Sequence, residues 1–521
     1  MDPILATFAI LVVAIIAFAS NRVPLGVVAV GVSLALYFTG VLAFPQAVAG
    51  FGDPTVLFIA ALFIVSESLD SSGVTAWAGQ KVIGSAGTAR TPLVIVVCLL
   101  VAGLTALISV NGAVAALLPL VIVVASGAGI ASSHMLLPLA FAAHAGSMLL
   151  LTGTPVNIIV SDAAADAGGR AFTFFEFALV GIPLVVGTIA IIVLLGKRLL
   201  PTRAAAAMPK DLSRLTRRLK LDYGVSLDGT PLVGPANGVS EVVIAPRSRL
   251  IGTTIFPGMA TPSGDLVTLG ARRGSEVLDG EEIVLQAGDA LLLQGSWDDL
   301  IRHTAHRDTV LVVDAPGGLR RAVPLGRGAK RSLVITVLMI VLLATGLVPP
   351  AAAAMLAACA LVLTKAVSVT QAYRSISWTT VVLVAGMIPL STAFLSTGAA
   401  QLVAQWLIST VGGWGPRIAL LAVVVLTIVL GQVISNTATV LIFAPVAVAV
   451  ATGMDVSVQP FMMALTVAGA ASFLTPIATP ANLMVMKPAG YRFGDYWKLG
   501  LPLAVFFAAV AVLYVPWVWA F

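Results

Sequence analysis

The apolar runs of this chain constrain its fold most, because many of them are long enough to cross a lipid bilayer. A helix needs about 20 apolar residues to span ~30 Å of hydrocarbon. Such runs occupy residues 4–19, 23–43, 55–80, 92–126, 134–160 and 177–196, and then 332–347, 350–367, 379–412, 417–450, 458–485 and 499–520. The sequence therefore predicts a mainly α, polytopic membrane protein surrounded by lipid.

Several of these runs are too long for one helix, and they contain Gly, Pro, Asn or Ser where a helix would break. Irregular backbone at membrane depth is tolerated only where it is buried in protein or lines a wet cavity. We therefore expect broken helices and re-entrant hairpins rather than a series of simple spans.

Charged side chains are concentrated in one segment. Residues 197–331 hold 19 of the 29 Lys and Arg and 14 of the 23 Asp and Glu. The predicted regions are a first transmembrane repeat (1–199), a linker (200–237), a small α+β domain (238–325) and a second transmembrane repeat (326–521). Basic loops are usual on the cytoplasmic side of a membrane protein. The net charge of +6 therefore does not indicate nucleic-acid binding.

The two membrane parts repeat each other. A shift of 325 residues places Ser147 on Ser472, Thr154 on Thr479 and Asn157 on Asn482, and a shift of 326 places Ser109 on Ser435. With the N-terminus outside and the insert cytoplasmic, most Lys and Arg of the short loops fall on the inner side in both halves, whereas the loop with Arg170 falls outside and is mostly acidic. The sequence thus predicts two inverted-topology repeats, placed in the cell (inner) membrane.

The first candidate site is a pair of related segments, residues 108–119 and 434–445. Each has Ser, Asn and small residues before an apolar run that ends in Pro. A broken helix exposes N–H groups at one end, which attract anions, and carbonyl groups at the other end, which attract cations. Two such ends at a repeat interface are a common binding arrangement in transporters.

The second candidate site is the pair of Thr-Pro segments 151–157 and 477–482, in which an Asn follows two residues after the Pro. Carbonyls at the preceding break, together with the hydroxyls of Thr154 and Thr479, are suitable ligands for Na⁺. A simple proline kink is the alternative for each segment alone.

Four ionisable side chains, Glu67, Asp70, His134 and His144, lie within or beside the apolar runs. Such groups are costly in a membrane and are usually functional. Glu67 and His144 are candidates for proton coupling, although neither has an ionisable counterpart in the second half. The alternatives are that Glu67 and Asp70 reach water at a helix break and that His144 is a structural histidine.

Catalytic motifs are absent from the sequence, and no enzyme activity is expected. There is no Walker A motif, and no Cys and His cluster has the spacing of a transition-metal site. His303 and His306 are three residues apart but lack a third ligand. No cofactor is expected, and Na⁺ is the predicted coupling ion.

The segment "SNTATVLIFAP", with Ser435, Asn436 and Thr437, resembles the divalent anion:sodium symporter family. The Thr-Pro-x-Asn segments and the run "GMIPLSTAFLSTGAA" are also similar to that family, and the resemblance covers both membrane parts. The insert resembles a TrkA-C domain, a regulatory module of potassium channels and transporters, with an unknown small ligand.

The resemblance implies a homodimer in which a transport part moves like an elevator against a scaffold part. It implies that a small anion, sulfate or a dicarboxylate, binds at Ser109, Asn111, Ser435, Asn436 and Thr437. It further implies that sodium binds at Ser109, Asn111, Gly153, Thr154, Asn157, Ser435, Asn436, Ala478, Thr479 and Asn482.

The first signature departs from the family pattern, because Val110 stands where the second half has Asn436. One amide donor is lost there, which favours a compact anion such as sulfate over a C4-dicarboxylate. Two alternatives remain open. One is a proton-coupled antiporter or exporter, for arsenite or for Na⁺/H⁺ exchange. The other is a membrane sensor that binds its ligand without moving it.

Overall fold

The computed structural model describes residues 2–20, 22–84, 89–203, 237–246, 248–261, 265–274, 276–278, 282–303, 310–312, 328–411 and 415–521. The chain forms two compact units: Met1–Glu67, Lys81–Ala207 and Val334–Phe521 in one, and Ser68–Gln80 and Met208–Leu333 in the other. Most of the predicted linker at 200–237, and the predicted domain after residue 312, lie outside the described residues.

Helices account for most of the described chain before the insert. They are α1 (Pro3–Ser20), α2 (Leu25–Phe38), α3 (Phe44–Ala47), η1 (Ala49–Gly52), α4 (Pro54–Ser71), α5 (Val74–Gly84), α6 (Arg90–Leu107), α7 (Val110–Gly127), α8 (Ser133–Gly146), η2 (Leu151–Gly153), α9 (Pro155–Asp166) and α10 (Glu176–Leu199).

The chain after the insert is also helical. Its elements are α14 (Ala329–Thr345), α15 (Pro350–Leu363), α16 (Val369–Ser375), α17 (Trp378–Ser396), α18 (Ala399–Val411), α19 (Pro416–Gly431), α20 (Asn436–Gly453), α21 (Val458–Ala470), α22 (Pro480–Met486), η4 (Phe493–Asp495), α23 (Tyr496–Ala509), η5 (Val510–Tyr514) and α24 (Val515–Val518).

The predicted interruptions of the long apolar runs are confirmed. Breaks separate α6 from α7, α8 from α9, α19 from α20 and α21 from α22. Six helical stretches of the described chain are long and apolar enough to cross a membrane: Pro54–Ser71, Arg90–Leu107, Glu176–Leu199, Trp378–Ser396, Asn436–Gly453 and Phe493–Val518. The mainly helical fold of an integral membrane protein is therefore as predicted, while the opposite orientation of the two repeats stays a prediction.

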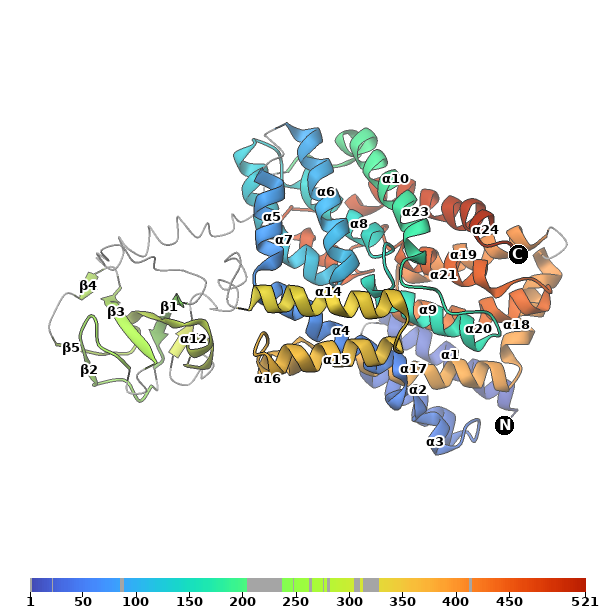
Figure 1. Cartoon of the computed structure of the whole chain (residues 1–521), viewed down its shortest axis with the longest axis horizontal. Coiled ribbons are helices and arrows are strands. Elements are labelled where there is room, and N and C mark those ends of the chain that lie inside the picture. The colour runs from blue at the N-terminus through green and yellow to red at the C-terminus, as the bar shows by residue number, and fades with distance from the viewer. Residues whose placement is uncertain are drawn as a thin grey trace. The chain divides into compact units, whose positions relative to one another are not determined.

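Helices from the two halves pack directly on each other within the larger unit. Helix α9 contacts α20 and α21, and α22 contacts α7 and α8. In Figure 1, the green-blue α9 lies beside the orange α20, although the two are far apart in the sequence. Every broken segment of one half thus has a neighbour from the other half, which brings the predicted site residues into reach of one another.

The insert contains the small sheet that its β-like sequence predicts. One sheet has the order β4-β3-β6-β1-β7 and the other pairs β2 with β5, all antiparallel. The strands are β1 (Asn237–Ile244), β2 (Thr254–Ile255), β3 (Leu266–Arg273), β4 (Glu276–Leu278), β5 (Ile283–Val284), β6 (Ala290–Ser296) and β7 (Val310–Val312), followed after β6 by the helix α12 (Trp297–His303). Buried aliphatic side chains and Trp297 form its core.

The ion pair between Arg273 and Asp289 stabilises the loop before β6. Asp289 accepts hydrogen bonds from Arg273 Nε at 2.7 Å and Nη2 at 2.8 Å, and from Gln286 N at 2.8 Å. The hydrogen bonds from Arg273 lower the pKa of Asp289 below its usual value despite its burial, with a further contribution from Gln286. The stabilisation is therefore present above the unfolded-state pKa of about 3.9, and it is lost as pH falls through the lower folded-state pKa.

We expect Asp289→Asn to weaken the protection of β6 amides against hydrogen exchange at neutral pH by about tenfold, because a charge-assisted hydrogen bond is lost. Exchange measured by mass spectrometry on the full chain checks this, with Glu282→Gln, an exposed carboxylate of the same unit, as the control. The gap between variant and wild type should close below about pH 4. Equal protection in all three proteins at pH 7 would contradict the assignment.

Candidate functional site

A cavity of about 310 Å³ lies where the broken helices of the two halves meet. It collects most of the predicted binding residues from both repeats. Those that line it are Ser109, Asn111, His144, Gly153, Thr154, Ser435, Asn436, Thr437, Ala478 and Thr479. The structure thus brings together both signatures and both Thr-Pro segments, whereas their roles in binding stay predictions.

The two signature segments place helix N-termini at this cavity. Ser109 caps α7, its Oγ accepting from Gly112 N at 3.2 Å, and Ser435 caps α20, its Oγ accepting from Ala438 N at 3.4 Å. A serine cap satisfies only one of the N–H groups that a helix start leaves without an intrahelical partner. The remaining N–H groups at each end are available to a ligand.

The two Thr-Pro segments add a second pair of helix N-termini. Thr154 caps α9, its Oγ1 accepting from Val156 N at 3.4 Å, and Thr479 caps α22, its Oγ1 accepting from Asn482 N at 3.3 Å. Both helices have proline as their first residue. Proline suits that position because its ring fixes the helical φ angle and no N–H is lost from the helix.

Four capped helix starts therefore surround one small cavity. Helix N-termini carry partial positive charge, so their fields add where they converge. Among the described residues, no Lys, Arg, Asp or Glu lines the cavity. The arrangement can hold an anion by backbone dipoles and uncharged side chains alone, without a fixed positive charge.

Asn157 and Asn482 are not among the residues that line the cavity, and their role as sodium ligands stays a prediction. Both are fully buried behind it. Asn157 Nδ2 donates to the carbonyls of Ser147 at 3.0 Å and Leu150 at 2.8 Å. Asn482 Nδ2 makes the corresponding bonds to Ser472 at 2.8 Å and Thr475 at 3.1 Å. The same contacts thus recur with the predicted shift of 325 residues, and each amide holds its loop in place.

The amide oxygens of this pair are buried. No described residue donates a hydrogen bond to Asn157 Oδ1, and none of ordinary geometry reaches Asn482 Oδ1, although the His144 imidazole lies close enough to the Asn482 side chain to interact with it. A buried polar atom without a hydrogen bond costs free energy. An oxygen in this position is suited to a cation, because Na⁺ needs only oxygen ligands and no hydrogen.

The two ionisable candidates for proton coupling lie in different places. His144 is buried and lines the cavity, and its Nε2 lies 3.1 Å from Thr479 Oγ1. Its ring also makes an edge contact with Phe473. Glu67 does not line the cavity. His144 is therefore the only ionisable side chain among the described residues that line the cavity.

The sequence did not predict a third group of polar side chains at the cavity. Ser377, Thr379 and Thr380, at the start of α17, line it together with Ser147. Ser377 Oγ lies 2.9 Å from Thr380 Oγ1. The sequence signal was the cluster Ser-Trp-Thr-Thr at the start of an apolar run, which is also common where a helix leaves a membrane.

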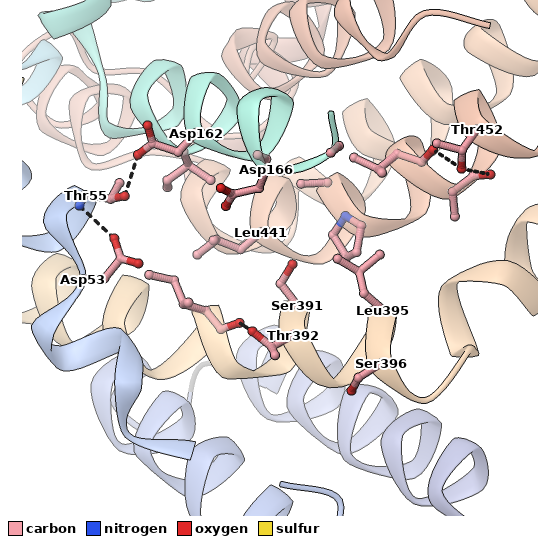
Figure 2. Close-up of a pocket in the computed structure, with 18 of the residues that line it drawn as sticks. Asp53, Thr55, Asp162, Asp166, Ser391, Thr392, Leu395, Ser396, Leu441 and Thr452 are labelled. Atoms are coloured by element: carbon pink, nitrogen blue, oxygen red, sulfur yellow. Dashed lines mark hydrogen bonds between the residues drawn. The ribbon is translucent and has the colours of Figure 1, made fainter. Parts of the chain in front are cut away.

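A second cavity, of about 700 Å³, lies at the opposite ends of α9 and α20 and has a different character. Figure 2 shows Asp53, Asp162 and Asp166 on one side of it, facing hydroxyl side chains of α17. Thr55 Oγ1 donates to Asp162 Oδ2 at 2.6 Å. Carboxylates and helix C-termini make this cavity negative, so it does not suit an anion.

The chain is similar to known membrane transporters over most of its length. A family described as citrate transporter (CitMHS) matches residues 15–468 and 416–521. The transporter YfbS of Escherichia coli (strain K12) is 29% identical over 601 residues, covering 98% of each chain. Sodium/sulfate cotransporter 1 of Chlamydomonas reinhardtii is 29% identical over 248 residues, which are 44% of this chain and 27% of that protein.

The solved structure of the Alcanivorax borkumensis YdaH transporter matches with a TM-score of 0.50, covering 93% of this chain and 89% of that chain at 14% identity. At this identity the likeness concerns the fold alone. The predicted resemblance is thus confirmed as far as a transporter with sodium/sulfate cotransporter relatives, while the symporter family named from the sequence and the TrkA-C domain stay predictions. The chain belongs to the citrate transporter (CitMHS) family of membrane transporters.

Proposed function

We propose that this chain is a secondary active transporter that carries a small divalent anion, sulfate or a dicarboxylate, together with sodium. The observation that carries the proposal is the convergence of four capped helix N-termini on one cavity that, among the described residues, no Lys, Arg, Asp or Glu lines. The citrate transporter family to which the chain belongs and its sodium/sulfate cotransporter relative support an anionic substrate.

Sodium fits the same cavity for a physical reason. A dianion held only by dipoles leaves uncompensated charge in a low-dielectric region. Sodium ions beside the anion would neutralise that charge. The buried Oδ1 atoms of Asn157 and Asn482, behind the two Thr-Pro loops, are oxygen ligands that could complete such sites. Substrate and cation would then stabilise each other's binding, which is the requirement for symport.

The cavity is asymmetric in a way that favours a compact anion. Asn436 offers an amide at the second helix start, whereas Val110 offers an apolar side chain at the first. An anion with two carboxylates far apart would therefore find one directed amide donor fewer at the first end than at the second. Sulfate, which carries its charge in one compact group, can be held mainly by Ser435, Asn436 and Thr437.

We further propose how the transporter assembles and how it moves. An elevator-type motion would carry the cavity across the bilayer in a homodimer of the inner membrane. The N-terminus would be outside and the insert cytoplasmic, and the insert would act as a TrkA-C-like domain that binds a small ligand.

Uptake by purified protein in vesicles tests the proposal. We expect an inward sodium gradient to drive accumulation of labelled sulfate, and potassium in place of sodium to abolish it. Unlabelled succinate and citrate, added in turn, should compete more weakly than sulfate. Flux that follows a proton gradient without sodium would overturn the proposal in favour of the antiporter alternative, in which His144 is the ionisable group at the cavity. Ligand binding without any flux would favour the sensor.

A further inference from the structure

Residues 201–203, which we call the strap, join the end of α10 to the segment that leads into the insert. The backbone of the strap is fixed to the start of α8. Ser133 Oγ donates to Pro201 O at 2.5 Å, and Arg203 N donates to Ser133 Oγ at 2.9 Å. Thr202 Oγ1 lies 3.2 Å from His134 Nε2. These hydrogen bonds hold the strap in a defined position against the start of α8.

The side chain of Arg203 extends the contact to the second half of the chain. Its Nη1 donates to Gly490 O at 2.5 Å and to Asp495 Oδ2 at 2.7 Å. The Asp495 side chain is only 7% exposed, and its Oδ2 also accepts from Arg492 N at 2.8 Å. The ion pair therefore fixes the strap to the connection between α22 and α23. Its two residues, Arg203 and Asp495, are 292 positions apart in the sequence.

The residue after Asp495 carries this contact to the cavity. Tyr496 is fully buried, and its hydroxyl donates to Asn482 O at 2.7 Å. Asn482 in turn holds the second Thr-Pro loop through Ser472 O and Thr475 O. Ser472 Oγ donates to Asn436 Oδ1. A continuous series of hydrogen bonds and one peptide link thus connects the strap to both Asn482 and the signature residue Asn436.

We propose that Arg203 is a positioning residue for the second-half cation site, acting through Asp495 and Tyr496 on the loop that Asn482 holds. This inference rests on the proposed sodium coupling. Asn482 does not touch Arg203, so Arg203 affects the site only by fixing where the Asn482 backbone lies. Because an ion needs its oxygen ligands at defined distances, a looser loop weakens sodium binding first.

This series of hydrogen bonds predicts how two variants change the sodium dependence of uptake. Tyr496→Phe removes one hydroxyl and keeps the buried ring, and Arg203→Ala removes the ion pair at the strap. Each should raise the sodium concentration for half-maximal uptake by about 3- to 10-fold, the range expected for one or two hydrogen bonds. At saturating sodium, the apparent KM for sulfate should stay within about twofold of wild type. The double variant should be no worse than the more affected single variant, because both act on one series.

Two further variants keep the test decisive. Arg170→Ala, which removes another arginine–carboxylate pair, with Glu176, should leave the sodium dependence unchanged. Arg203→Lys should recover part of the loss, because it keeps the charge and one contact. Unchanged sodium dependence in both Arg203→Ala and Tyr496→Phe would overturn the proposal, as would fully additive effects. If wild-type uptake itself needs no sodium, the proposed function fails instead, so the two failures are distinguishable.

Discussion

Asn436→Ala is expected to reduce sodium-driven sulfate uptake by about 10- to 100-fold while the protein remains folded. Asn436 is the first residue of α20 and lines the cavity. Its Oδ1 accepts from Ser472 Oγ, which orients the amide and leaves Nδ2 as a donor. A hydrogen bond to a charged group contributes about 1.5–3 kcal/mol, and that contribution is lost with the amide.

The fold should survive Asn436→Ala because Ser435, and not Asn436, caps the helix. Thr452→Ala is the matched control, since Thr452 lies at the other end of α20 and its hydroxyl bonds to Val448 O of its own helix. Uptake and thermal unfolding of both variants should be measured together. Wild-type uptake and affinity in Asn436→Ala would remove Asn436 from the binding site.

Gly153→Ala is expected to abolish most transport by displacing the first Thr-Pro loop. A Cβ atom at Gly153 would lie 2.2 Å from the carbonyl oxygen of Ser147. No side-chain adjustment relieves a contact with backbone, so the loop has to move. Ser147 O is also an acceptor for Asn157 Nδ2, and this bond would be disturbed. We expect at least a tenfold loss of sodium-dependent uptake and a lower melting temperature.

Gly103→Ala is the matched control for Gly153→Ala. A Cβ atom at Gly103, inside α6, meets nothing within 4 Å. Alanine is a better helix former than glycine, by about 1 kcal/mol, so this variant should be as active as wild type and equally or more stable. If Gly153→Ala transports normally with unchanged sodium dependence, the loop is not a rigid part of the site.

The breaks and the signature residues could be predicted from the sequence for a physical reason. Pro, Asn and Ser inside an apolar run are costly unless the backbone breaks there and lines a cavity. Ser109, Asn111, Asn436 and Thr479 were found in this way, and the structure places all four at one cavity. The duplication added to the signal, because the same polar residue at the same place in both halves is rarely accidental.

Other parts of the site could not be predicted from the sequence. The contact of Arg203 with Asp495 joins residues 292 positions apart, and both look like ordinary loop charges. The family resemblance implies that Asn157 and Asn482 are sodium ligands, and this stays a prediction; that their Nδ2 atoms hold the loops from behind could not be read from the sequence. Which face of a residue meets a cavity depends on tertiary packing, which the local pattern does not contain.

The position of the bound anion tests the central claim most directly. Selenate is a heavier analogue of sulfate, and its selenium scatters anomalously, so it can be located in crystals grown with sodium. Anomalous density is expected in the smaller cavity, beside the N-terminus of α20 at Ser435, Asn436 and Thr437, and it should vanish when potassium replaces sodium. Density in the larger, carboxylate-lined cavity, or density that does not depend on sodium, would contradict the claim that converging helix ends and sodium hold the anion.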